Sequence, residues 1–151
     1  MGSNQEATQK KLRESHPIAG TSVRNPVDTI IIFDPAKLRE TVAIIGAAAN
    51  IDAVMFHLSF SFGAWRRSAS WFDPNTYRER AVEALVEARA ECGKPVVVVL
   101  RPPLDTQAMD QSMAFQQMCW QNGIPVFPSI PRAANAFAKL LRWRENRTEH
   151  L

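Results

Sequence analysis

The run Gly93-Lys94-Pro95-Val96-Val97-Val98-Val99-Leu100 gives the clearest structural signal in the chain. Five consecutive branched apolar residues, without polar alternation, are typical of a strand that is buried on both faces of a parallel sheet. Gly93 suits the left-handed position that follows a helix end. The run therefore predicts that a helix ends just before Gly93 and that a buried strand begins at Val96.

Further apolar runs of strand length lie on either side of this one, at Thr29–Phe33, Ala53–Leu58 and Ile124–Phe127. A helical pattern follows each strand, over about 35–49, 74–91, 106–121 and from 131 onward. Asp34-Pro35 and Asp73-Pro74 begin two of these helices, because aspartate caps free N–H groups and proline fits the first turn. Pro125 lacks a ladder donor, so we expect the last strand at a sheet edge.

The strand–helix alternation predicts a doubly wound α/β domain with parallel strands, right-handed crossovers and helices on both faces. Within this class we expect a flavodoxin-like three-layer α/β/α fold, with a four-stranded sheet in the order 2-1-3-4. The domain is expected over residues 21–147. Residues 1–20 are polar and lack hydrophobic periodicity, which predicts a flexible tail, and residues 148–151 form a short C-terminal tail.

Composition narrows the class of protein. The 151 residues fit one domain, and 46% hydrophobic with 22% charged residues is ordinary for a globular chain. The net charge of +3 comes from scattered cations, which does not favour nucleic-acid binding. No apolar run approaches the ~20 residues of a membrane span. Cys92 and Cys119 lie in expected helices without a metal-binding context, so we expect reduced thiols, no metal site and a cytoplasmic protein.

Ligands of open parallel sheets bind beyond the carboxyl ends of the strands. The loops expected there contain neither a glycine-rich phosphate loop nor a GxSxG elbow. Asp34 would repel phosphate after the first strand. His57 is expected as a core or strand-end histidine, and no Ser/His/Asp or Cys/His arrangement can be built from the spacing. The sequence therefore predicts no catalytic residue.

The loop Ser59–Asp73 holds Phe60, Phe62, Trp65, Trp71 and Phe72 together with Arg66 and Arg67. Such a loop is either a docking surface or lid, with Arg66 and Arg67 meeting an anion, or a segment whose aromatic side chains complete the core. Arg101 and Ser129, which follow later strands, are further candidate anion contacts.

Three segments resemble one protein family. Ser22-Val23-Arg24-Asn25-Pro26-Val27-Asp28 resembles the start of the second flavodoxin-like module of the ADP-forming (NDP-forming) acyl-CoA synthetases, which include the acetate–CoA ligases. Gly93–Val99 is similar to the Gly-Lys-Pro strand of that module. The stretch 123–134 is similar to its Gly-Ile-Pro-Val strand and last helix. The resemblance covers about residues 20–145, with the segments in the family's order.

This resemblance implies a module of an acyl-CoA ligase that converts acid, CoA and ATP to acyl-CoA, ADP and phosphate through a phosphohistidine carried by another module. CoA and ATP-Mg would bind to partner CoA-binding and ATP-grasp domains or subunits, so this chain would bind no cofactor and be inactive alone. In the related succinyl-CoA synthetases, the module presents a helix N-terminus to the phosphohistidine. Asp34-Pro35 stands here in place of a glycine-rich turn.

Two alternatives stay open beside the ligase module. One is a stand-alone interaction or regulatory module that docks through the loop 59–73. The other is an independent binder of small anions at the strand ends, and a homo-oligomer is compatible with each. Asn25 and Asp28 are candidate ligand residues, although Asn25-Pro26 also fixes an extended lead-in and Asp28 can accept backbone hydrogen bonds.

Overall fold

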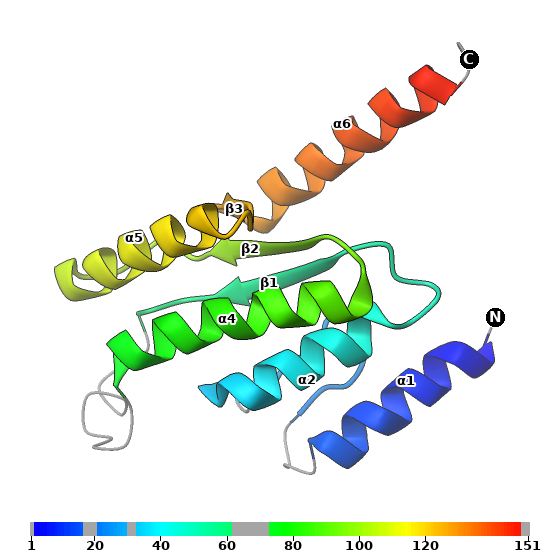
Figure 1. The fold of residues 1–151 in the computed structure, drawn as a ribbon, viewed down its shortest axis with the longest axis horizontal. Coiled ribbons are helices and arrows are strands. Elements are labelled where there is room, and N and C mark those ends of the chain that lie inside the picture. Colours follow the sequence, from blue (N-terminus) through cyan, green and yellow to red (C-terminus); the bar gives the residue numbers. More distant parts are fainter. Residues whose placement is uncertain (1, 17–20, 30–32, 62–72, 149–151) are drawn as a thin grey trace.

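The computed structural model describes residues 2–16, 21–29, 33–61 and 73–148 (Figure 1). The chain folds into helices and strands in the order α1 (Gly2–Ser15), α2 (Pro35–Gly46), β1 (Val54–Leu58), α4 (Pro74–Cys92), β2 (Val96–Leu100), α5 (Thr106–Gln121), β3 (Val126–Phe127) and α6 (Ile130–Thr148). The strand–helix alternation confirms the expected α/β class.

The sheet of the described residues has three parallel strands in the order β1-β2-β3. β1 pairs with β2 along its whole length, from Val54 opposite Val96 to Leu58 opposite Leu100. β3 pairs with the other edge of β2, with Phe127 opposite Val99. All five residues of β2 are buried, as the unbroken apolar run predicted.

This pairing differs from the expected order 2-1-3-4. That order would insert the strand expected at 29–33 between β1 and β2, which instead bond directly to each other. It would also separate α2 from α4 across the sheet. The two helices pack side by side (Figure 1), and Arg39 of α2 pairs with Glu87 and Glu91 of α4. Residues 30–32 of the expected strand lie outside the described residues.

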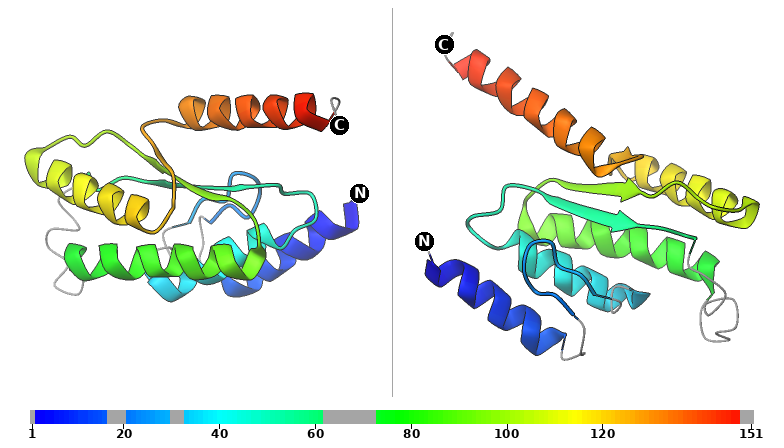
Figure 2. Two further views of the ribbon diagram at one scale, coloured as in Figure 1. Left: turned by 45° about the horizontal axis from the view of Figure 1, so that its top comes forward. Right: turned by 180° about the vertical axis from the view of Figure 1, so that it is seen from behind.

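The main core lies between the sheet and the helices on one of its faces. Leu38 and Val42 of α2 meet Ala81 and Leu85 of α4 against the inward side chains of β1 and β2, and Phe115 of α5 joins them. α6 lies across the sheet from α4 (Figure 2), with Ala133 fully buried. The described helices therefore occupy both faces of the sheet.

The amino-terminal segment forms a helix in place of the flexible tail expected for residues 1–20. α1 packs against α2, and Leu12 and His16 are 1% and 3% exposed. Leu12 is the one leucine in a helix of mostly polar residues, so the sequence lacks the apolar stripe that would have predicted a docked helix. Packing of these two side chains, rather than amphipathicity, holds α1 on the domain.

Candidate functional site

The three parallel strands end at one edge of the sheet, and hydroxyl groups join the segments that follow β1 and β2 there. Ser59, directly after β1, accepts a hydrogen bond at its Oγ from the N–H of Ser61 at 3.2 Å. The Ser61 Oγ in turn accepts from the N–H of Leu104 at 2.7 Å, which ties the segment after β1 to the segment after β2. Both hydroxyl groups are thus engaged in holding the backbone at this edge.

Aspartate side chains cap the helices that begin at this edge. Asp34 Oδ1 accepts from the N–H of Ala36 at 2.9 Å, as its place before Pro35 predicted. Asp105 caps α5 in the same way through the N–H of Ala108, at 2.7 Å. Each carboxylate satisfies a free N–H group and adds negative charge, so the N-termini of α2 and α5 do not favour an anion.

Asp73 makes the most extensive of these caps, at the start of α4. Its carboxylate accepts from the N–H groups of Asn75 and Thr76, at 3.1 and 3.0 Å, and from the Thr76 hydroxyl at 2.5 Å. The hydrogen bond from the Thr76 hydroxyl, followed by those from the backbone, lowers the pKa of Asp73. The carboxylate form is therefore the one that α4 stabilises.

The structure brings two of the sequence-predicted anion contacts to the same edge. Arg101 follows β2, and its N–H donates to the Leu58 carbonyl at 2.9 Å while the residue is exposed. Ser129 follows the neighbouring strand β3, and its Oγ accepts from the N–H of Arg132 at 3.4 Å. Arg66 and Arg67, the other two, lie outside the described residues.

Asn25 and Asp28 lie in a closed loop instead of the expected extended lead-in. The Asn25–Pro26 peptide bond is cis, and Ser22 and Asp28 form an antiparallel bridge with two backbone hydrogen bonds of 2.9 Å. Both Asn25 and Asp28 are exposed. Asp28 contributes its main chain to this bridge, so the loop is closed by backbone groups.

Phe60, near the start of the aromatic loop, packs against the core. Its ring lies 5.5 Å from that of Phe115 with an interplanar angle of 62°, an edge-to-face contact. This part of the segment therefore completes the core, whereas residues 62–72, with both tryptophans, lie outside the described residues.

A groove of about 430 Å³ lies beside the first turns of α6. It is lined by Phe127, Pro128, Arg132, Asn135, Ala136 and Lys139. Sequence reasoning missed this groove. The spacing of Arg132, Asn135 and Lys139 along one helix face could have suggested a shared polar face, but not that Phe127 and Pro128 form its other wall. Its two cations and one amide favour an anionic group, yet Arg132, Asn135 and Lys139 are all exposed.

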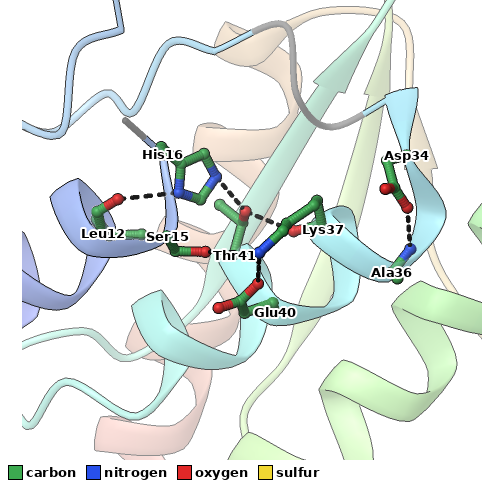
Figure 3. A network of polar contacts seen from close by, with 8 residues as sticks. All are labelled: Leu12, Ser15, His16, Asp34, Ala36, Lys37, Glu40 and Thr41. Carbon is green, nitrogen blue, oxygen red and sulfur yellow. Dashed lines mark hydrogen bonds and ion pairs between the residues drawn. The ribbon is translucent and has the colours of Figure 1, made fainter. Parts of the chain in front are cut away.

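The imidazole of His16 lies beside the hydroxyl of Thr41, as a general base lies beside a nucleophile, but this pair is buried between two helices. His16 Nε2 lies 2.7 Å from the Thr41 hydroxyl (Figure 3), which also donates to the Lys37 carbonyl at 2.6 Å. His16 Nδ1 lies 3.0 Å from the Leu12 carbonyl. Both side chains are buried where α1 meets α2, so this network joins two helices.

The remaining reactive groups give no catalytic arrangement. Burial raises the pKa of the Cys119 thiol to about 12, which keeps it protonated and unreactive. His57 is exposed on β1. Where α4 meets α5, Arg78 Nε and the Ser112 hydroxyl are buried without a partner. The described part of the chain holds no group of three or more metal-ligating side chains.

Polar contacts at the strand ends are thus directed mainly to the chain's own backbone, and the basic groove beside α6 begins at Phe127 and Pro128, at the end of β3. Among the described residues, no helix combines the length and apolar character that crossing a membrane requires. The chain matches no protein-family model, no curated protein and no solved structure.

Proposed function

We propose that the chain is a docking domain or small subunit of an NDP-forming acyl-CoA ligase, which joins an acid to CoA with ATP and releases ADP and phosphate. It contributes no catalytic residue and binds no cofactor itself. It supports the phosphohistidine step by holding the CoA-binding and ATP-grasp partners, which carry CoA and ATP-Mg.

The observation that carries this proposal is the apolar surface exposed on two helices. Met109, Met113 and Trp120 recur along one face of α5, and Met113 and Trp120 are 64% and 58% exposed. α6 adds Leu140, Leu141 and Trp143. Single exposed apolar side chains are ordinary, but several on one helix face mark interaction surfaces. Such surfaces suit a domain that works packed against others.

The resemblance to the ligases supplies the identity of those partners. Its three segments correspond to the closed loop 22–28, the connection from α4 into β2, and β3 with the start of α6.

The Asp34 cap limits which ligase role is proposed. In succinyl-type enzymes a helix N-terminus of this module faces the phosphohistidine, whereas the N-terminus of α2 carries a carboxylate bonded to Ala36. That charge would repel phosphate. We therefore propose a role in docking and not in stabilising the phosphoryl group at α2.

The same cap favours a second candidate, a stand-alone interaction or regulatory module without a ligase partner. The third candidate, a small-anion binder at the strand ends, has its best support in the basic groove beside α6. The three differ in what the chain binds: ligase domains, another protein, or a small anion.

Activity of the purified assembly tests the proposal. The full chain with an amino-terminal tag is expressed in its own cells, purified with its bound proteins, and assayed for ADP release that depends on both CoA and an acid. We expect activity in the assembly and none in the chain purified alone. ADP-forming acyl-CoA synthesis by the chain alone, or none by an assembly with bound proteins, would contradict the proposal.

A further inference from the structure

The carboxyl-terminal half of α6 extends beyond the domain. Ala133, in the first turn, is fully buried, but each residue from Lys139 to Arg147 is exposed. Figure 1 shows this part of the helix leading away from the sheet. Its side chains therefore form a surface of their own, separate from the core.

An apolar stripe follows this part of the helix. Phe137, Leu140 and Leu141 have the spacing i, i+3 and i+4, which places them on one face. Leu140 and Leu141 are 57% and 52% exposed. Arg144 falls on the same face, since it lies seven residues after Phe137. Trp143, three residues after Leu140, lies at the border of this face, and the guanidinium of Arg147 lies 4.9 Å from its ring centroid.

The projecting segment is strongly basic. Between residues 139 and 147 it carries Lys139, Arg142, Arg144 and Arg147 against the single carboxylate of Glu145, four positive charges against one negative. An anionic surface complements this segment. A second copy of α6 does not, because two such helices packed together would oppose like charges.

The position of Arg144 selects a protein over a membrane as the anionic partner. Amphipathic helices that lie on membranes keep their cations on the polar face and insert the apolar one. Here Arg144 stands within the apolar stripe and would enter the hydrocarbon with Leu140 and Leu141, at a high cost. A protein groove can instead place one carboxylate opposite Arg144, between pockets for the two leucines.

We propose that this segment is a docking helix whose apolar stripe enters a groove of the partner protein, with a carboxylate opposite Arg144 and further acidic groups around the rim. That the partner is a ligase subunit rests on the proposed function. The groove chemistry follows from α6 itself.

A matched pair of arginines provides the test. Arg144→Glu reverses the charge on the apolar stripe, whereas Arg142→Glu makes the same change two residues away on the opposite side of the helix. Leu140→Ser/Leu141→Ser removes the apolar anchors. Proteins captured by the tagged full chain are identified by mass spectrometry, and the dominant one is purified and titrated with each variant. Circular dichroism checks that the variants, all at exposed positions, keep the fold.

We expect Arg144→Glu and the double serine variant each to weaken binding by at least about 10-fold, and Arg142→Glu by no more than about 3-fold, since rim charges contribute less than desolvated ones. Equal effects of the two arginine changes would overturn the docking mode. So would capture of no protein, or sedimentation of the wild-type chain with phosphatidylserine vesicles. A partner that is lost with Arg144→Glu but has neither a CoA-binding nor an ATP-grasp domain would uphold the docking helix and refute the ligase.

Discussion

At the scale of single residues, His16 and Thr41 show how a polar pair can join two helices without an ion pair. Nδ1 of His16 lies beside the Leu12 carbonyl and therefore carries a proton. Its Nε2 lies 2.7 Å from the Thr41 hydroxyl, which donates its proton to the Lys37 carbonyl. These contacts link the end of α1 to α2.

Replacing Thr41 with valine removes this partner while keeping the shape of the side chain. Because the His16 nitrogen would be left buried and unpaired, we expect the free energy of unfolding to fall by about 1–3 kcal/mol. Urea unfolding measures the loss. Thr106→Val, at an exposed position, is the control and should change it by less than about 0.5 kcal/mol. If Thr41→Val and Thr106→Val both changed the free energy of unfolding by the same small amount, the hydrogen bond between His16 and Thr41 would not be what holds α1 on α2.

The two cysteines should differ in reactivity. Cys119 is fully buried with a pKa of about 12, whereas Cys92 is half-buried. The thiolate is the reactive form, so labelling of Cys119 at pH 8 requires opening of the fold. We expect a Cys92→Ala chain to react with a disulfide reagent at least about 10-fold more slowly than a Cys119→Ala chain. Comparable native-state rates would contradict the packing of α5.

At the scale of elements, the Asp73 cap couples the stability of α4 to pH. Its pKa is lower in the folded chain than in the unfolded chain, so the cap stabilises the fold above the unfolded value of about 3.9. This contribution is lost as pH falls through the folded value. Asn also caps helices but carries no charge. The stability difference between wild type and Asp73→Asn should therefore shrink as pH falls below about 4, measured by urea unfolding. A difference that stays constant would refute the cap.

Two glycines end helices for different reasons. Gly93 has φ 65° with open space around a β-carbon, so Gly93→Ala costs the strain of the left-handed position, about 1 kcal/mol. At Gly46 a β-carbon would lie 2.6 Å from both Cβ and Sγ of Cys92. Gly46→Ala should therefore cost more, up to about 3 kcal/mol, because α2 and α4 must separate. Thermal or urea unfolding of both variants checks this ranking, and the reverse order would contradict the close approach of α2 to α4.

Local patterns in the sequence predicted most elements but not how they are joined. The run at Val96 predicted the buried strand β2, and the Asp-Pro pairs predicted the starts of α2 and α4. Strand order depends on which edges pair, and the same alternation fits both 2-1-3-4 and the observed β1-β2-β3. α1 was missed because its docking depends on Leu12 and His16 rather than on an apolar stripe. For the candidate site, Arg101 and Ser129 could be placed at the sheet edge, but the groove wall at Phe127 follows only from tertiary packing.

At the scale of the whole molecule, polar side chains near the strand ends bond to the chain's own backbone, whereas two helices expose apolar side chains to solvent. Carboxylates cap α2, α4 and α5, and serine hydroxyls hold the loops after β1 and β2. In contrast, α5 exposes Met113 and Trp120, and α6 exposes Leu140 and Leu141. This distribution favours a role in binding other proteins over chemistry at the sheet edge.

The proteins bound to the full chain in its own cells test the central proposal most directly. Purification through an amino-terminal tag, followed by mass spectrometry of the intact assembly and of its components, identifies them. The ligase account predicts a stable assembly that contains CoA-binding and ATP-grasp domains. A chain that purifies alone, or only as copies of itself, while calorimetry shows it binding CoA, ATP-Mg or phosphate would contradict that account and favour an independent small-molecule binder.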